Sequence, residues 1–391
     1  MSLIPHLSTS SSSSSSSRTY EICLVCGANY GTPDYRYEVF VVDVGPSSGG
    51  DHGLRVLRNP LFRIPEGYAT MGFFAVDSSI YFLGGFRLNE PDPSLRISND
   101  VYVYDTSSSD SAIKKLSCMN YGKLLPVIIG PLNEKFYAIS KYLSYHDFEV
   151  FDPKLDSWSC LCQPPVPDSP ENDFAYAIDS YAVVNQDREI LMLTSVGLYS
   201  YYIDSDKWHF YGKAASIPFV YDRRSTGCTV SIGGDCCLGF THCCDFRDPN
   251  LGFIHPKCDD DGHIVLGTYR HNSSDHTWHD FHRICDWPEK EKVECRAYPM
   301  SLGDGLVCAV VSGYDPGYDP GYDQIVPAPA PAYDDDPHLP STHIISIGVF
   351  VDGPKFNPLY THQYKDDHNM KHCKRTLVAS FPLFRSKQRT V

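Results

Sequence analysis

The chain has 391 residues, of which 42% are hydrophobic and 13% aromatic, so it can supply the core of one large domain or of two ordinary ones. Its formal net charge of −15 would repel phosphate backbones, which argues against nucleic-acid binding as the main role. No apolar run is long enough to cross a bilayer, so we expect no membrane partner.

Serine dominates residues 1–20, and this stretch lacks the apolar segment of a secretory signal. We interpret it as a disordered tail, with a plastid transit segment as the alternative because such segments are also rich in serine. Without a secretory signal, the 15 cysteines are expected to be reduced thiols in a cytoplasmic or nuclear protein.

Residues 21–385 consist of short runs of β-branched and aromatic residues separated by Gly, Pro, Asp, Asn and Ser. Helical periodicity is almost absent, so the pattern predicts an all-β sandwich, barrel or propeller. A unit made of a strand and a following aromatic–Asp pair recurs about every 50 residues, within the range expected of propeller blades. We therefore expect a single propeller over residues 21–385, followed by a short tail at 386–391.

The repeated unit combines a glycine pair, an aromatic–Asp pair and a later tryptophan. The residues that carry it are Gly84, Gly85, Tyr104, Asp105, Phe151, Asp152, Trp158, Asp204, Trp208 and Trp278. This pattern resembles the kelch-repeat family of β-propellers, in a degenerate, plant-type form. The glycines would allow a close-packed bend, the Asp would accept amide hydrogens in a turn, and the Trp would pack between blades.

The strand count favours six blades, with seven as the alternative if residues 226–300 contain another. The N-terminal unit has strands at 21–27, 37–43 and 54–58 but no innermost strand. We expect residues 376–381 to supply that strand and to close the ring, which would remove exposed sheet edges.

Three further segments complete the expected propeller. Residues 174–184 are expected to form the innermost strand of the fourth blade, and residues 264–269 the third strand of the fifth. Residues 313–341 contain repeated Tyr-Asp-Pro and Pro-Ala sequences, which predict a low-complexity loop within the last blade.

A cluster of cysteine and histidine raises the question of a metal site. Its members are Cys228, Cys236, Cys237, His242, Cys243, Cys244 and Cys258. Adjacent cysteines point to opposite faces of a strand and replace the spacing of a compact zinc knuckle, so we favour buried thiols over structural zinc. We expect no metal, cofactor or catalytic residue.

Two groups of propellers supply enzyme alternatives, the copper radical oxidases and the iron-binding plant specifier proteins. The Glu-x-x-x-Asp-x-x-x-His spacing of the specifier group does not occur in this sequence. The resemblance thus favours a monomeric, non-catalytic interaction module that acts as a scaffold or client-recruiting subunit. The alternative is a metal-assisted enzyme with its site at the propeller axis.

Kelch-like propellers commonly bind a partner protein through loops on one face. Arg and Tyr are enriched among the residues that dominate protein interfaces. The loop residues expected to bind are therefore Arg87, Arg96, Tyr142, Tyr221, Arg223 and Arg224.

Overall fold

The computed structural model describes sixteen ranges of the chain. They are 19–28, 35–45, 55–57, 59–64, 67–108, 112–166, 176–212, 229–233, 236–242, 264–272, 277–287, 296–303, 306–314, 343–351, 358–365 and 375–383. Within these ranges the chain forms strands, turns and short 3-10 helices but no α-helix, so the prediction of an all-β chain is confirmed. No helix in the described ranges is long and apolar enough to span a membrane.

The described strands form six sheets of four or five strands and one two-stranded pair. The first sheet has the order β27 (Arg375–Leu383), β1 (Tyr20–Ala28), β2 (Arg36–Val44), β4 (Phe62–Ile64). The second is β6 (Gly72–Val76), β7 (Ser79–Leu83), β9 (Val101–Asp105), β10 (Lys114–Lys115). The third is β11 (Val127–Leu132), β12 (Lys135–Ile139), β13 (Glu149–Asp152), β14 (Ser157–Cys160).

The remaining sheets follow the same plan. The fourth is β15 (Ser180–Val184), β16 (Glu189–Thr194), β17 (Gly197–Tyr202), β18 (Lys207–Gly212). The fifth is β19 (Thr229–Gly233), β20 (Cys236–His242), β21 (Ile264–Asn272), β22 (Thr277–Trp287). The last is β23 (Arg296–Gly303), β24 (Leu306–Tyr314), β25 (His343–Val351), β26 (Pro358–Lys365), β3 (Arg55–Val56). The separate pair is β5 (Tyr68–Ala69) with β8 (Phe86–Arg87).

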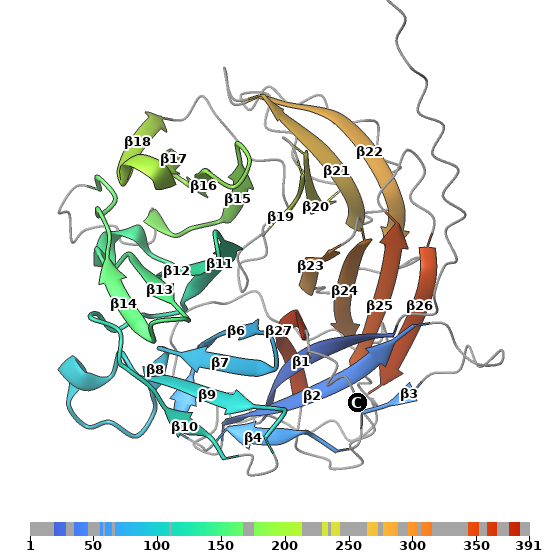
Figure 1. Ribbon diagram of the computed structural model, residues 1–391, viewed down its shortest axis with the longest axis horizontal. Helices are drawn as coiled ribbons and strands as arrows, with labels where there is room; N and C mark the ends of the chain where they lie inside the picture. Colours follow the sequence, from blue (N-terminus) through green and yellow to red (C-terminus); the bar gives the residue numbers. More distant parts are fainter. Residues whose placement is uncertain are drawn as a thin grey trace, which may run out of the picture.

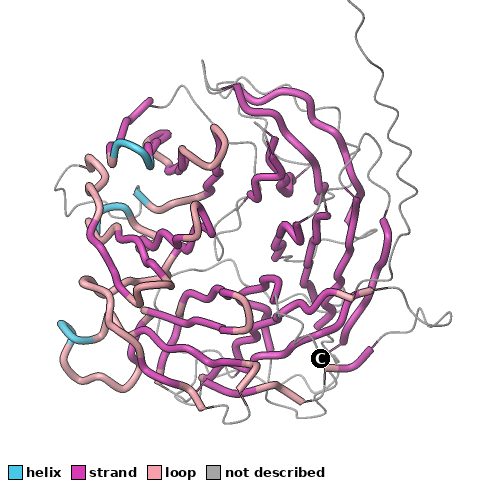
Figure 2. Tube along the Cα trace, viewed as in Figure 1, coloured by secondary structure: helices cyan, strands magenta, loops and turns pink. Residues whose placement is uncertain are grey.

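The sheets lie one after another around a common centre (Figure 1). Their inner strands are neighbours: β6 lies beside β27 and β11, β19 lies beside β15 and β23, and β23 lies beside β27. Figure 2 shows that the few helical turns all lie in connections between strands. They are η1 (Pro93–Leu95), η2 (Leu143–Tyr145) and η4 (Ile203–Ser205) among the described residues.

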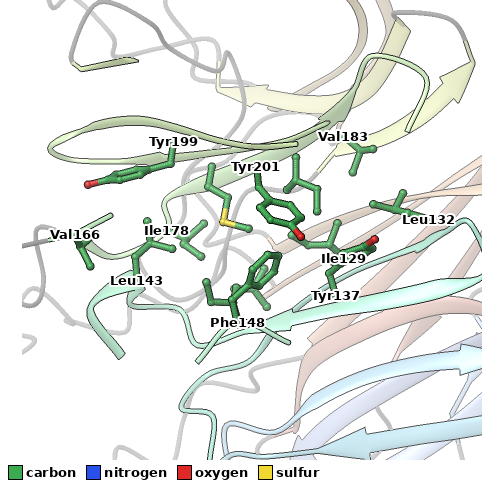
Figure 3. Close-up of a cluster of buried hydrophobic side chains, with 14 residues drawn as sticks. Ile129, Leu132, Tyr137, Leu143, Phe148, Val166, Ile178, Val183, Tyr199 and Tyr201 are labelled. Atoms are coloured by element: carbon green, nitrogen blue, oxygen red, sulfur yellow. The ribbon is translucent and has the colours of Figure 1, made fainter. Parts of the chain in front are cut away.

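Apolar side chains fill the spaces between neighbouring sheets. One cluster joins the third and fourth sheets, where Phe148 packs edge-on against Tyr201 at 4.7 Å between ring centroids (Figure 3). Other clusters join the first and second sheets, the second and third, and the last and first. Because the first sheet is covered on both faces in this way, β1 is buried along most of its length instead of on alternate residues.

The two ends of the chain meet in the first sheet. β27 pairs with β1 in antiparallel register from Glu21 opposite Leu383 to Ala28 opposite Arg375. The expected pairing of residues 376–381 with the N-terminal unit therefore corresponds to a ladder in the structure.

The expected fourth strand of the N-terminal unit, at 54–58, is wrong. Residues Arg55–Val56 form β3, which pairs in parallel with Tyr364 and Lys365 of β26 in the last sheet. The outer strand of the first sheet is instead β4, which pairs with β2. A short apolar run predicts a strand without indicating its partner, and here the chain crosses to the neighbouring sheet edge before it returns.

Two other boundaries differ from expectation. The inner strand of the fourth sheet begins at Ser180, not at residue 174, because Ile178 and Asp179 bond to Lys141 and Leu193 at the end of the sheets. β24 runs to Tyr314, so the first two residues of the expected 313–341 loop belong to a strand, while the rest lies outside the described residues.

The repeat residues lie at turns and between sheets. Gly84 and Gly85 follow β7 with φ of 63° and 87°, and a side chain at Gly85 would collide with the Ala69 carbonyl. Asp105 accepts from the Ser107 amide at 2.9 Å, and Asp152 accepts from the Lys154 amide at 3.0 Å.

The tryptophans contact neighbouring sheets. Trp158 stacks on Phe151 of its own sheet at 4.8 Å and packs against the cluster between the second and third sheets, and Trp208 packs on Phe148 of the third sheet at 5.3 Å. Asp204 forms an ion pair with Arg188 at 3.7 Å. Trp278 lies on β22, where side chains fall outside the description.

Leu377 provides a test of the contact between the last and first sheets. Its side chain is fully buried in their shared cluster, so Leu377→Ala should lower the free energy of unfolding by about 2–5 kcal/mol. Leu155→Ala, at a side chain that is 72% exposed, should change it by less than about 0.5 kcal/mol. Urea unfolding measures both, and equal effects would contradict the packing of β27.

Candidate binding surface

The connections between strands gather at two ends of the sheets, and these ends differ. At one end, here the turn end, the chain reverses at 77–78, 133–134, 153–156 and 185–188. At the other, here the loop end, lie longer connections, whose described residues are 84–100, 116–126, 140–148, 161–166 and 176–179. Longer loops on a rigid scaffold are where binding residues concentrate, so the loop end is the candidate surface.

Backbone hydrogen bonds join the loop end of the second sheet to the chain that enters the third. Gly85 donates its amide to the Lys123 carbonyl at 2.8 Å, and Lys123 donates to Ser98 at 3.0 Å. Lys141, from the third sheet, donates to Leu124 at 3.1 Å. The bases of successive loops are thus held together.

The Arg87 side chain is used inside the loop that carries it. Its Nη2 lies 2.6 Å from Asp100 Oδ2, and its Nη1 donates to the Leu95 carbonyl at 3.1 Å. Both ends of the 86–99 connection are therefore tied to one guanidinium. Arg87 thus holds the shape of this connection, and its role in binding a partner stays a prediction.

Arg96 is also engaged within the same connection. Its Nε donates to the Glu90 carbonyl at 3.0 Å, and its guanidinium carbon lies 6.0 Å from the centre of the Phe86 ring. The structure brings Arg87 and Arg96 into one loop, where the backbone amide of Arg87 donates to the Arg96 carbonyl at 2.8 Å.

Asp100 is the centre of a polar cluster at the start of β9. Besides Arg87, its carboxylate accepts from Tyr68 at 2.9 Å and forms an ion pair with Lys115 at 2.6 Å. Burial alone would raise the pKa of Asp100, but the bonds from Lys115, Arg87 and Tyr68 outweigh it and hold that pKa well below its ordinary value. The cluster therefore stays ionised at neutral pH and anchors the loop.

A second cluster lies deeper, between the second and third sheets. Lys123 and Glu149 are completely buried, and Lys123 Nζ lies 2.7 Å from Glu149 Oε2 and 2.5 Å from the Asp147 carbonyl. Glu149 Oε1 also accepts from the Asn120 amide at 2.8 Å. Since every charged group here has a partner, the arrangement fixes the connection 116–126 against β13.

Asp147 and Ser140 extend this buried cluster. The Ser140 amide donates to Asp147 Oδ1 at 2.9 Å, and its hydroxyl donates to Oδ2. Burial raises the pKa of Asp147, and it outweighs the opposing effects of Lys123 and of the Ser140 bonds. Ser140 thus occupies the place after β12 that the glycine pair occupies after β7, and it closes its loop with a side chain.

Lys141 and Asp179 face each other where the third and fourth sheets meet. The Ile178 amide donates to the Lys141 carbonyl at 2.7 Å, which brings Asp179 beside this junction. Burial raises the pKa of Asp179 to about 6, while the Lys141 charge acts to lower it. The Asp179 carboxyl therefore ionises at a mildly acidic pH that unfolding experiments can cover.

The other expected binding residues fall in different places. Tyr142 is half-buried, forms a bridge to Ala177, and its ring centroid lies 6.2 Å from that of Tyr145. Tyr221, Arg223 and Arg224 lie outside the described residues, as do the side chains of the cysteine- and histidine-rich segment 228–263. Elsewhere in the described part, no three His, Cys, Asp or Glu side chains are grouped to hold a metal.

Sequence reasoning missed Asp100, Lys123 and Glu149. Lys123 lies just before the apolar run that leads into β11. A lysine at such a position predicts an ordinary solvated side chain. The only signal in the sequence is a carboxylate at each strand start, with Asp100 just before Val101 and Glu149 as the first residue of β13. That signal does not reveal which cation lies opposite.

Comparison with known families adds one match. The family model described as "Protein of unknown function (DUF1668)" matches residues 29–223, a range that includes the loop end of the second and third sheets. No curated protein matches the chain.

Solved structures resemble the chain only distantly. The structure titled "Structure of YjhT" gives a TM-score of 0.37 at 11% identity, covering 64% of this chain and 73% of the other. Apo AztD from Citrobacter koseri gives 0.30 at 10%, covering 89% and 98%. The WD40 domain of SCAP from fission yeast gives 0.25 at 9%, covering 86% and 84%. At these scores the likenesses carry no inference about function.

Lys123→Met tests the buried ion pair. It leaves the Glu149 carboxylate buried without its cation, so the free energy of unfolding should fall by about 3–5 kcal/mol. Adding Glu149→Gln should recover part of this loss, because glutamine is neutral yet still accepts from the Asn120 amide. Urea unfolding compares the variants, and a double variant no more stable than Lys123→Met would refute the pairing.

Asp179 predicts a pH dependence with a definite sign. Its folded-state pKa of about 6 exceeds the value of about 3.9 expected when unfolded, so its contribution is fully present below pH 4 and lost as pH rises through 6. The wild-type chain should therefore lose more stability between pH 4 and pH 6 than Asp179→Asn. Urea unfolding across this range measures the difference, and parallel curves would contradict it.

Proposed function

We propose that this chain is a six-bladed, kelch-like β-propeller that binds another protein through its loop end and catalyses no reaction. The observation that carries the proposal is a long, ordered loop at that end. The 86–99 connection exposes Leu88 and Leu95 while its two arginines are bound within it. An exposed segment held in one conformation by internal bonds is suited to binding a partner with little ordering cost.

The sheet arrangement supports the propeller part of the proposal. Each of the six sheets supplies one inner strand to a common centre, and β27 takes the inner position of the first sheet (Figure 1). On this view β27 closes the ring, and β3 covers the outer edge of the last blade next to it.

Further apolar and aromatic groups lie at the same end. Tyr121 and Tyr145 are 46% and 40% exposed and lie on the connections 116–126 and 140–148. Aromatic side chains that are rigid and partly exposed are typical anchors at protein interfaces. Together with the 86–99 connection they extend the proposed surface across the second and third blades.

The buried charges do not favour an enzyme. Lys123, Glu149 and Asp147 are satisfied by one another and by backbone groups, and all three are buried. They account for the rigidity of the loop end without needing a substrate. The metal-assisted alternative at the axis would instead require ligands to gather there.

Proximity labelling with the full chain fused to a biotin ligase tests the proposal. Replacing the exposed loop-end residues Leu88, Leu95, Tyr121 and Tyr145 by serine should abolish the specific neighbours. Replacing Leu155, exposed at the turn end, and Leu61, exposed just before β4, should leave them unchanged. Neighbours that persist in the loop-end variant would refute this surface, and stoichiometric metal in the purified protein would favour the enzyme.

A further inference from the structure

We infer that residues 86–99, here the knob loop, insert into an apolar pocket rimmed by basic side chains on the partner protein. This inference rests on the proposed function and specifies the chemistry of the partner. It also changes the role of the arginines that the sequence predicts as contacts. They shape the knob loop, and other side chains meet the partner.

The tip of the knob loop is apolar. Leu88 is 37% exposed and Leu95 is 51% exposed, and Pro91 and Pro93 between them are exposed as well. Single exposed leucines are common on protein surfaces. Here two leucines and two prolines occur within eight residues, on a segment that extends outward from the sheets (Figure 1). Exposed apolar groups are therefore concentrated at this tip.

Among the charged side chains of the tip, Asp92 is exposed, whereas Glu90 and the two arginines are half-buried. Arg87 is bound to Asp100, and Arg96 lies over Phe86 and bonds to the Glu90 carbonyl. Glu90 and Asp92 carry carboxylates near the two leucines. Hydrogen bonds from Ser94 lower the pKa of Asp92, so it is ionised at neutral pH. A complementary pocket therefore needs apolar walls and a basic rim.

The knob loop is held in shape before it meets a partner. Pro93 begins η1, which Asp92 caps through the Ser94 amide at 2.9 Å. The Leu88 amide donates to the Gly67 carbonyl at 2.8 Å, and the β5–β8 pair joins the base of the loop to the segment before β6. Such preorganisation removes much of the entropy cost of binding.

The same charges exclude two other classes of partner. Nucleic acids and anionic lipid surfaces attract exposed cations, whereas this tip exposes the Asp92 carboxylate and holds its two arginines in internal bonds. Exposed apolar side chains next to a carboxylate instead fit an apolar pocket with a basic rim in another protein. The tip thus favours a basic partner surface, whereas exposed arginines would favour an acidic one.

A photo-crosslinker within the full chain tests the knob loop directly. Leu95→p-benzoylphenylalanine should cross-link one partner protein, at a peptide that combines apolar residues with Lys or Arg. Glu90→Gln with Asp92→Asn should reduce the yield about tenfold at low salt and less at high salt, because screening weakens the charge contribution. These two changes keep the oxygen acceptors that bond the Asp92 and Ser94 amides.

Control positions separate the possible failures. Cross-linking from position 145 but not from 95 would overturn the knob loop and leave the proposed function standing. No cross-linking from positions 88, 95, 121 or 145 would overturn both. Equal yields from position 95 and from position 155, at the turn end, would show unspecific contact and overturn the knob loop. A yield unaffected by Glu90→Gln with Asp92→Asn would overturn the basic rim.

Discussion

Aromatic packing between neighbouring sheets is the interaction on which the rest of this structure depends. A four-stranded sheet has two faces, and in the first three sheets both faces are covered by neighbouring sheets. Phe151 and Trp158 fill one junction, and Phe148, Tyr201 and Trp208 fill the next. These rings fix the spacing of the sheets. The loops connect strand ends, so the spacing of the sheets also fixes where the loops lie. The position of the loop end therefore depends on the aromatic packing between the sheets.

Buried charges add specificity to this packing. Apolar contacts tolerate small shifts of one sheet against another, whereas the Lys123–Glu149 pair does not, since a shift would leave two charges buried apart. The same logic applies to Asp100, which receives Arg87 from one loop and Lys115 from a different strand. The Lys123–Glu149 pair lies where the connection from the second sheet meets the third, and the Asp100 cluster joins the 86–99 connection to β10 of the second sheet. Polar groups thus fix the relative positions of segments that apolar contacts alone would allow to shift.

The sequence predicts local features better than partners. Runs such as Ile80–Leu83 and Val101–Asp105 mark strands because alternation and turn residues are local signals. The run at 54–58 was equally visible, yet its partner is β26, some three hundred residues away, and no local signal could indicate that pairing. The pairing of Arg87 with Asp100 cannot be predicted for the same reason, because it depends on how the 86–99 connection folds.

This division explains why the two arginines of the 86–99 connection, which interface statistics favour as binding residues, are bound within their own loop. Arg87 and Arg96 have the fixed geometry that makes arginine effective in interfaces, and the chain uses that geometry to shape its own loop. The side chains left outside are leucines, prolines and carboxylates, which lie in none of the clusters between sheets. Their replacement leaves the core intact. The exposed tip can therefore vary its binding chemistry while the arginines and the buried charges keep its shape.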